Sequence, residues 1–380
     1  MEQTEQSEQT ACLLAIHSLF GAANTSLKKV LDFYGGDAVA AWQDSGNWQQ
    51  IEGCDNQSIL ELTYKKGAID LECLYQRFLD ADAHLLSIYE ATYPRFLKNI
   101  HNPPPLLFYR GTLPADNDLC IAMIGSRRAT AYGRQVGQML AHDLSVQGIT
   151  VVSGMARGID SVCHQAALAA GGRTIAILGS GIDVVYPREN NILYQQIIKN
   201  GAVISEQPLG MEPLPHNFPL RNRIISGLSR GVVVIEAGHK SGTLRTVDFA
   251  LEQGRDVFAV PGNINQENCY GTNNLLKQGA IVVTEADDIV NVYLDDICLL
   301  PQRVIVSDKN DEDIDNSTLT KDERVILAKM IEPISVEKLQ MISGWEYAKL
   351  STMLLLLELR GLIAKDANQC YYALFTRHKL

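Results

Sequence analysis

Small, hydroxyl-bearing and basic residues directly follow several short apolar runs of this 380-residue sequence. They are Gly125, Ser126, Arg127 and Arg128; Ser153 and Gly154; residues 179–181; Lys240, Ser241, Gly242 and Thr243; and residues 261–263. Glycine lets a ligand approach the backbone closely, and the first N–H groups of a following helix attract anions. The pattern predicts a set of phosphate-binding loops.

The usual nucleotide-binding fingerprints are missing from these loops. No G-x-G-x-x-G follows the first apolar run, and no G-x-x-x-x-G-K-[ST] occurs in the chain. The second run ends in Ser153 and Gly154, where a dinucleotide-binding fold would carry an acidic residue for the ribose. The sequence therefore predicts phosphate sites without a nucleotide cofactor.

Basic side chains accompany the loops and could follow a chain of phosphates. They are Arg127, Arg128, Arg157, Arg221, Arg223, Lys240 and Arg245. The planar guanidinium group donates hydrogen bonds in pairs to phosphate oxygens. Because one mononucleotide needs only one or two such loops, the pattern favours a polymeric anion.

An aromatic residue, Phe218, stands shortly before Arg221 and Arg223. Aromatic and cationic side chains together are typical of single-strand binding, where stacking is worth about 1–3 kcal/mol per base. Two alternatives stay open. Phe218 could pack in the core, and the two arginines could pair with carboxylates such as Glu206 or Glu236.

Charge is distributed unevenly along the chain. The formal net charge is −11, which on average opposes binding to a polyanion. Residues 121–262, however, carry 13 Lys and Arg against 10 Asp and Glu, and the local field decides how a charged ligand is attracted. This middle segment is the candidate for an anionic ligand.

From residue 119 to about 297 the chain alternates between apolar runs and helical patterns. The runs are 120–125, 149–154, 174–181, 202–206, 231–238, 256–262 and 280–285, and helical patterns cover 133–148, 160–172 and 189–201. Continuous apolar strands separated by helices are typical of a parallel sheet covered on both faces. We expect an α/β fold with an open, doubly wound, Rossmann-like parallel sheet, whose ligands bind beyond the carboxyl ends of its strands.

Different patterns flank this segment. Helical spacing at 11–20, 27–35 and 79–94 is followed by prolines that favour an extended segment at 102–111. Residues 307–318 are polar and acidic, as in a linker. Three helical patterns and a short strand pair then follow in the order of a winged helix, with a plain three-helix module as the alternative. We expect a helical domain at 1–105, the α/β domain at 106–300, an acidic linker at 301–318 and a winged helix at 319–380.

The remaining composition is typical of a reducing cytoplasm. Eight cysteines are scattered without a CxxC pair, which predicts neither a disulfide framework nor a zinc site. The polar, acidic N-terminus is unlike a signal peptide, and the most apolar late stretch, 353–363, is too short to span a bilayer. We expect a cytoplasmic protein with no cofactor, no metal site and no membrane contact.

Several segments of the middle region are recognisable by their order and spacing: "MIGSRRATAYG", "VVSGMARGIDSVCHQAAL", "GRTIAILGSGIDVVYPREN", "NFPLRNRIISGLSRGVVVIEA" and "SGTLRTVDFALEQGRDVFAVPGNI". Together they resemble the DNA-processing protein A family (DprA, also called Smf). The N-terminal helices are similar to that family's helical domain of SAM or helix-hairpin-helix type, and the tail is similar to its winged helix.

The resemblance implies a non-enzymatic protein that binds and protects incoming single-stranded DNA during natural transformation. It also implies loading of RecA recombinase onto that strand and a homodimer formed through the Rossmann-like domain. The family's DNA-contacting arginine falls on Arg127, and its neighbouring contacts fall on His216, Phe218, Arg221, Arg223 and residues 240–243. The chain departs from the family at Arg245, where an apolar residue is common.

The predicted nucleic-acid-binding residues are Gly125, Ser126, Arg127, Arg128, Ser153, Gly154, Arg157, His216, Phe218, Arg221, Asn222, Arg223, Lys240, Ser241, Gly242 and Thr243; no catalytic residue is predicted. The alternative function is a nucleoside-monophosphate phosphoribohydrolase of the lysine-decarboxylase-like group. That group follows a similar Gly-Thr loop with paired glutamates, whereas residues 244–246 here are Leu, Arg and Thr. Acid–base work on a glycosidic bond needs such a carboxylate pair, so the sequence disfavours the hydrolase.

Overall fold

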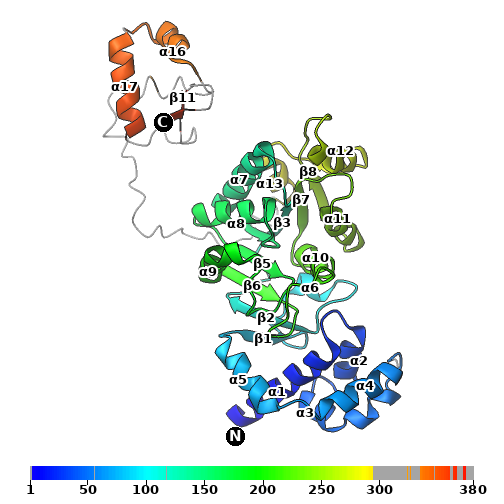
Figure 1. Ribbon diagram of the computed structural model, residues 1–380. Coiled ribbons are helices and arrows are strands. Elements are labelled where there is room, and N and C mark those ends of the chain that lie inside the picture. Colours follow the sequence, from blue (N-terminus) through cyan, green and yellow to red (C-terminus); the bar gives the residue numbers. More distant parts are fainter. Residues whose placement is uncertain are drawn as a thin grey trace. The chain divides into compact units, whose positions relative to one another are not determined.

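The apolar runs that follow residue 119 are strands of one nine-stranded sheet in the computed structural model of the chain (Figure 1). The structure describes residues 2–54, 56–116, 118–293, 323, 326, 334–345, 347–359, 363–365 and 371–373. The chain divides into two compact units, Met1–Ile305 and Val306–Leu380.

The sheet of the first unit has the strand order β1-β2-β6-β5-β4-β3-β7-β8-β9. Its strands are β1 (His84–Ser87), β2 (Leu106–Gly111), β3 (Cys120–Gly125), β4 (Thr150–Ser153), β5 (Thr174–Leu178), β6 (Gly201–Ser205), β7 (Gly231–Glu236), β8 (Asp256–Ala259) and β9 (Ile281–Val282). Strands β3 to β9 run parallel, whereas β1 and β2 join the edge beside β6 as antiparallel strands.

The strand order reverses between β3 and β7. From β3 the chain steps outward through β4, β5 and β6 on one side, and it returns to build β7, β8 and β9 on the other. The expected open doubly wound sheet is confirmed, with an antiparallel edge that the apolar runs did not predict. In such a sheet the reversal opens a crevice at the carboxyl ends of the two central strands.

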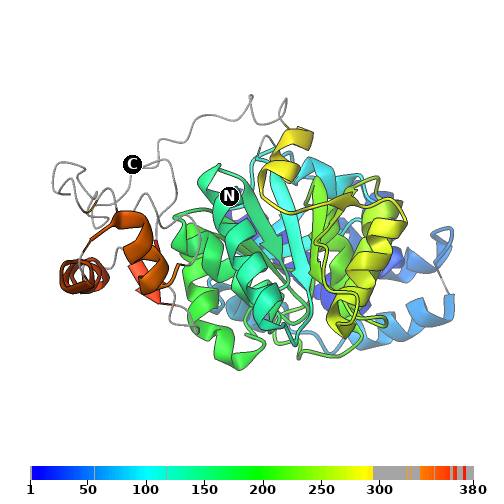
Figure 2. The ribbon, with the colours of Figure 1, turned by 90° about the horizontal axis from the view of Figure 1, so that it is seen from above.

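Helices cover both faces of the sheet, as Figure 2 shows from above. The helices that pack on one face are α7 (Ala131–Val146), α8 (Ile159–Ala169), α9 (Asn191–Asn200) and α13 (Asp287–Val290). Those on the other face are α6 (Arg95–Lys98), α10 (Asn217–Gly227), α11 (Thr243–Glu252) and α12 (Tyr270–Lys277). Three short 3₁₀ helices, η2 (Arg188–Asn190), η3 (Glu267–Cys269) and η4 (Asn291–Tyr293), lie in the connections.

The N-terminal segment forms a helical layer below the sheet edge in Figure 1. It comprises α1 (Glu2–Phe20), α2 (Thr25–Phe33), α3 (Ala38–Gln43), the 3₁₀ helix η1 (Ser45–Gln50), α4 (Asn56–Lys66) and α5 (Leu71–Asp80). Side-chain caps at Asn24, Asp37 and Asp70 accept backbone N–H groups and start α2, α3 and α5. None of the described helices is long and apolar enough to cross a bilayer.

Residues 79–94 do not form the helix that their apolar spacing predicts. Helix α5 ends at Asp80, and β1 pairs with β2 in the register His84↔Tyr109 to Ser87↔Leu106. This pairing satisfies backbone groups and buries Leu86, so long-range contacts override the local helical pattern. The sheet consequently begins at residue 84, within the expected helical domain.

The described part of the second unit has two helices and a strand pair. They are α16 (Val336–Ser343), α17 (Tyr347–Leu359), β10 (Ile363–Lys365) and β11 (Tyr371–Ala373), with the strands antiparallel. Ser335 caps α16, and Gly344 ends it in a left-handed conformation (φ 69°). The predicted linker at 301–318 and most of the helical pattern at 320–331 lie outside the described residues.

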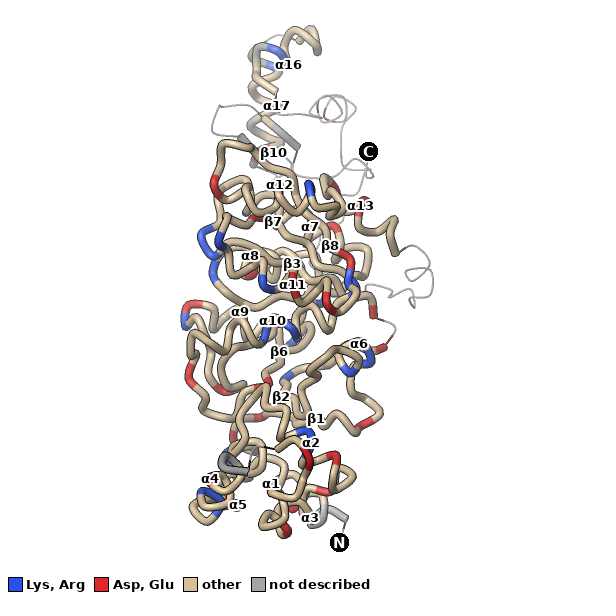
Figure 3. Tube along the Cα trace, turned by 90° about the vertical axis from the view of Figure 1, so that its right-hand side faces the viewer, with Lys and Arg blue, Asp and Glu red and all other residues tan. Residues whose placement is uncertain are grey.

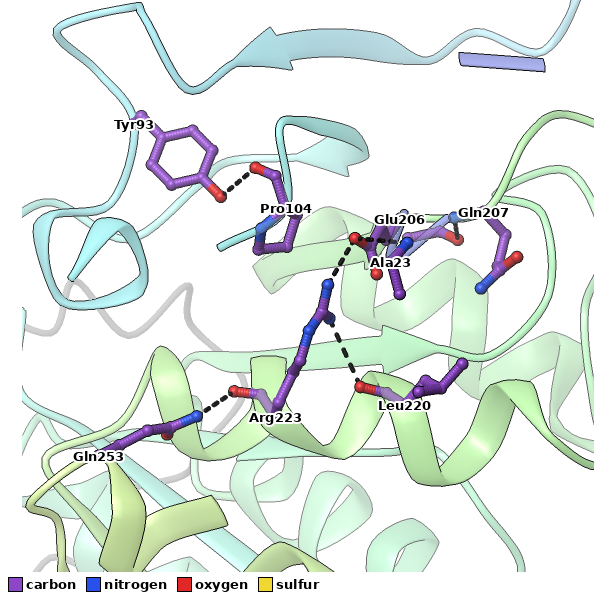
Figure 4. A network of polar contacts seen from close by, with 9 residues as sticks. Ala23, Tyr93, Pro104, Glu206, Gln207, Leu220, Arg223 and Gln253 are labelled. Atoms are coloured by element: carbon purple, nitrogen blue, oxygen red, sulfur yellow. Dashed lines mark hydrogen bonds and ion pairs between the residues drawn. The ribbon is translucent and has the colours of Figure 1, made fainter. Parts of the chain in front are cut away.

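A buried ion pair joins the helical layer to the α/β layer (Figure 4). Arg223 of α10 lies with Nη2 2.6 Å from Oε1 of Glu206, which directly follows β6. The same oxygen accepts the backbone N–H of Ala23, between α1 and α2, at 3.1 Å. The two side chains are 6% and 2% exposed, so each charge depends on the other for stabilisation.

Glu206→Gln removes one charge of this pair and is expected to lower the free energy of unfolding by about 3–5 kcal/mol, because Arg223 would remain buried without a counter-charge. The double variant Glu206→Leu/Arg223→Leu should recover a large part of that loss. Urea unfolding measures both. The matched control is Glu189→Gln in the exposed Arg157–Glu189 pair, which should leave stability nearly unchanged. If Glu206→Gln and Glu189→Gln lowered the free energy of unfolding equally, the buried pair would not have the stabilising role assigned to it.

His17 of α1 is buried at the same junction, with its ring 5.5 Å from that of Phe108 on β2. Neither ring nitrogen has a hydrogen-bond partner among the described residues. Burial lowers the pKa of His17 to about 4. The folded state therefore keeps this imidazole neutral, and protonation favours the unfolded chain.

Acid should weaken the fold through His17. The contribution of neutral His17 to the free energy of unfolding is complete above the unfolded-state pKa of about 6.5, and it is lost as the pH falls toward 4. Between pH 7 and pH 5 we expect this residue to account for about 2 kcal/mol of lost unfolding free energy. His17→Leu should show a correspondingly smaller loss in urea unfolding at the two pH values. In the exposed control His101→Leu, the free energy of unfolding should fall between the two pH values by as much as in the wild type. The prediction is refuted if His17→Leu also shows the wild-type fall.

Candidate functional site

A cavity of about 740 Å³ lies beyond the carboxyl ends of β3 and β7, where the strand order reverses. The loop after β3, the loop after β7 and helix α10 all contribute lining residues. Predicted site residues that line it are Gly125, Ser126, Arg127, Arg128, Phe218, Arg221, Asn222, Ser241, Gly242 and Thr243. Loops that stand far apart in the sequence thus meet at one place.

A second, smaller cavity of about 50 Å³ continues from the first. It brings in two more predicted residues, Gly154 and Arg157, and shares Arg127 and Phe218 with the larger cavity. Tyr186, which the sequence did not single out, lines both. The two cavities are adjacent, and we call them together the strand-end groove.

Backbone contacts hold the two loops of the groove together. The hydroxyl of Thr243 donates to the carbonyl of Gly125 at 3.1 Å, and Ser126 Oγ accepts the N–H of Arg128 at 3.1 Å. Asn268 donates through Nδ2 to the carbonyl of Arg128 at 3.0 Å. The position of the two arginines is therefore set by the backbone, while their side chains remain exposed.

Three cations at the groove keep their charge available. Arg127, Arg128 and Lys240 are exposed and form no ion pair with another described residue. In Figure 3, basic positions (blue) lie near the labels of α8 and α10, two helices that cover opposite faces of the sheet. Cations without internal partners attract an external anion more strongly than paired ones.

Arg221 forms part of the groove's floor. Its guanidinium donates through Nη1 to the carbonyl of Gly154 at 2.8 Å and to that of Ile177. Burial lowers the pKa of Arg221 to about 10, and the nearby carboxylate of Asp160 opposes that shift. The group remains charged at neutral pH. A side chain at Gly154 would collide with it, since a Cβ there would lie 2.2 Å from Nη2.

Two helices at this edge begin with the protein's own carboxylates. Glu236 accepts the N–H of Thr130 at 3.0 Å at the start of α7, and Asp160 accepts the N–H of Ala156 at 3.3 Å beside the start of α8. Helices α9, α10, α11 and α12 start without a side-chain cap from the N-cap residue and without an acidic residue in the first turn. Of these four helices, α10 and α11 contribute residues of their first turn to the lining of the larger cavity, although the N–H of Thr243 in α11 already donates to Ser241 Oγ at 3.2 Å. A ligand's anion in the cavity would lie close to the positive ends of α10 and α11.

Four predicted residues do not line the groove. Ser153 is buried and donates to the carbonyl of Met123 at 2.6 Å. His216 and Lys240 are exposed next to the lining residues. Arg223 points to the other side of α10 into its ion pair with Glu206, so the pairing alternative holds for this residue (Figure 4).

Arg245, whose role the family resemblance left open, lies on the exposed side of α11. Its Nη1 is 3.9 Å from Oδ2 of Asp248, and both side chains are more than half exposed. Such a surface contact contributes little to stability. Arg245 does not line the groove.

Several lining residues escaped sequence reasoning. Tyr186 follows the small residues 179–181, so an aromatic residue in a strand-end loop was a usable signal. No such signal marked Asp160, Asn268, the two prolines of the loop before α10 (Pro213 and Pro215) or Pro219 in its first turn. Asn268 reaches Arg128 across 140 residues of chain, a contact that only the tertiary fold creates.

Comparison with known proteins places these features in a family. The profile described as DNA recombination-mediator protein A matches residues 84–294, and that of the DprA winged helix domain matches residues 312–368. DNA processing protein DprA of Streptococcus pneumoniae is 38% identical over 271 residues, which are 71% of this chain and 93% of that protein. Protein Smf of Escherichia coli is 45% identical over 208 residues, which span only 56% of its own length.

Solved structures agree with this placement. The X-ray structure of Streptococcus pneumoniae DprA superposes with a TM-score of 0.65 and 35% identity, covering 75% of this chain and 97% of that one. A Helicobacter pylori DNA processing protein A, described with a unique single-stranded DNA binding mode, has a TM-score of 0.50 and 30% identity, covering 56% and 96%. With its strand-end groove and its matching profiles, the chain belongs to the DprA/Smf family of DNA-processing proteins.

Proposed function

We propose that the strand-end groove binds single-stranded DNA with little sequence preference. The observation that carries this proposal is the exposure of Arg127 and Arg128, which form no ion pair with another described residue and line the larger cavity together with Thr243 at the start of α11. An anion in this cavity would meet two cations beside the positive end of a helix. The relative from Helicobacter pylori, with its described single-stranded DNA binding, supports the same ligand.

The shape of the groove favours a polymer over a small metabolite. Its two cavities share four lining residues and differ greatly in size, about 740 and 50 Å³. The smaller cavity is too small to enclose a nucleotide, but with the larger one it extends the lined surface to Arg157, beyond what a single phosphate would need. Contacts to the backbone would bind any sequence, since phosphates carry no sequence information.

The phosphoribohydrolase alternative has less support. Catalysis on a glycosidic bond needs two placed carboxyl groups. The carboxylates that line the larger cavity are Asp160 and Glu267. Asp160 is buried and already accepts the N–H of Ala156 near Arg221. We therefore propose a binding protein without an enzymatic step.

We further propose that the bound strand is handed to RecA recombinase during natural transformation, and that the protein acts as a homodimer through its α/β domain. Membership of a family described as DNA recombination mediators supports the first part. A protein that holds a strand by its phosphates leaves base edges accessible, which a recombinase filament requires.

Arg127→Ala is expected to weaken binding of labelled oligo-dT at least about 10-fold, because a charge-assisted hydrogen bond contributes about 1.5–3 kcal/mol. The loss should be similar for unrelated sequences, and wild-type affinity should fall steeply with salt. Fluorescence anisotropy measures both. Arg134→Ala, on the exposed side of α7 and outside the groove, is the matched control. An unchanged affinity in Arg127→Ala with an intact fold would end the proposal, as would release of base from AMP without strand binding.

Loading predicts that the protein shortens the lag before RecA assembles on single strands coated with single-strand-binding protein. Assembly is followed through the DNA-dependent ATPase activity of RecA. Arg127→Ala should restore the lag at concentrations where the wild type removes it, while Arg134→Ala should behave as the wild type. If the wild-type protein leaves the lag unchanged, the loading role is refuted, while the proposal that the groove binds DNA is unaffected.

A further inference from the structure

One cation of the strand-end groove is already bound to a carboxylate of the protein. Arg157, on the loop between β4 and α8, donates through Nε to Oε1 of Glu189 and through Nη2 to Oε2, the second contact at 3.0 Å. Both oxygens of the carboxylate thus meet the planar fork of the guanidinium group. A phosphate group binds arginine in the same bidentate way.

Arg157 therefore differs from the other exposed arginines of the groove. Arg127 and Arg128 form no ion pair with another described residue, whereas Arg157 is paired with Glu189. The hydrogen bond from Arg157 lowers the pKa of Glu189, so the carboxylate is ionised at neutral pH. Since Arg127 and Arg157 both line the smaller cavity, a strand held by Arg127 would lie close to this pair.

A buried asparagine fixes the two loops of the pair relative to each other. Asn190, next to Glu189 in η2, donates through Nδ2 to the carbonyl of Met155 at 2.8 Å and to Oγ of Ser161 at 2.9 Å. These contacts join η2 to the loop that carries Arg157. The carboxylate therefore lies beside the guanidinium group without a ligand, and neither loop has to move for the pair to form.

The pair itself opens at little cost. The side chain of Arg157 is 63% exposed and that of Glu189 is 53% exposed, and exposed ion pairs contribute little to stability because water screens them. Among the residues that the structure describes, no other carboxylate lies within ion-pairing distance of Arg157. Loss of the Glu189 carboxylate would therefore leave a free guanidinium group at the groove with little effect on the fold.

We infer that Glu189 occupies Arg157 in the place of a phosphate and so limits the affinity of the strand-end groove for single-stranded DNA. This inference rests on the proposed function and adds a restraint to it. A strand gains a contact with Arg157 only if it displaces the carboxylate, and the displaced carboxylate still repels the phosphates beside it. A groove with one cation neutralised in this way releases a strand more readily, as transfer to a second protein requires.

The test removes the carboxylate and measures the binding of labelled oligo-dT by fluorescence anisotropy over a range of salt concentrations. Glu189→Gln should bind about 2- to 5-fold more tightly than the wild type at low salt, which is the range of one exposed ion pair. Its plot of log affinity against log salt concentration should be steeper by about 0.7, because one more phosphate is neutralised. The double variant Arg157→Gln/Glu189→Gln lacks the freed guanidinium group and should lose both the gain and the steeper slope.

Asp82→Asn is the matched control for Glu189→Gln. Asp82 forms an ion pair with Arg110 at 3.0 Å, so this variant also removes one negative charge and frees one arginine. Arg110 pairs in register with Val203 of β6 and does not line the groove. Asp82→Asn should therefore bind oligo-dT as the wild type does.

The inference and the function on which it rests can fail separately. The inference is overturned if Glu189→Gln binds no more tightly than the wild type, if the double variant keeps the gain, or if Asp82→Asn shows an equal gain. It is also overturned if the double variant loses as much affinity as Arg127→Ala, because Arg157 would then already contact the strand in the wild type. If the wild type does not bind oligo-dT, or if Arg127→Ala binds it as the wild type does, the proposed function fails and the inference with it. A thermal melt of each variant confirms that the fold persists.

Discussion

Two buried guanidinium groups hold helix α10, and the strand-end groove depends on that helix. Arg221 reaches the carbonyl groups at the ends of β4 and β5 on one side, and Arg223 reaches Glu206 on the other. From this helix Phe218 and Asn222 line the groove. Buried charges are costly unless they are paired and hydrogen-bonded. These two buried arginines keep their partners only when α10 lies in one position. The wall of the groove that α10 forms therefore has a fixed shape.

The distribution of negative charge also directs where a ligand can bind. In a doubly wound sheet every helix that follows a strand offers a positive end at the same edge. Here Glu236 and Asp160 already occupy two of those ends, so part of the edge is neutralised from within. The first turns of α10 and α11 carry no carboxylate, and both helices line the larger cavity together with Arg127 and Arg128. The positive charge that remains available at this edge therefore lies at the cavity.

The strands and the meeting of their loops could be predicted from the sequence, because a continuous apolar run such as 120–125 is itself the signal for a buried parallel strand. The partners of the α10 arginines could not. Arg221 meets Gly154 across 67 residues, and Thr130 meets Glu236 across 106 residues. No local pattern distinguishes an arginine that binds a ligand from one that binds a carbonyl group. Strand β1 was missed for the same reason, since its pairing partner lies beyond a proline-rich turn.

Glu206 has a consequence for how distant parts of the molecule influence each other. Its carboxylate holds α10 through Arg223 and the connection between α1 and α2 through Ala23. A carboxylate shared in this way links two equilibria, and linkage is reciprocal. A partner that stabilises the N-terminal helices would also stabilise the position of α10. By the same reciprocity, a ligand in the groove would stabilise the packing of the N-terminal helices by an equal free energy.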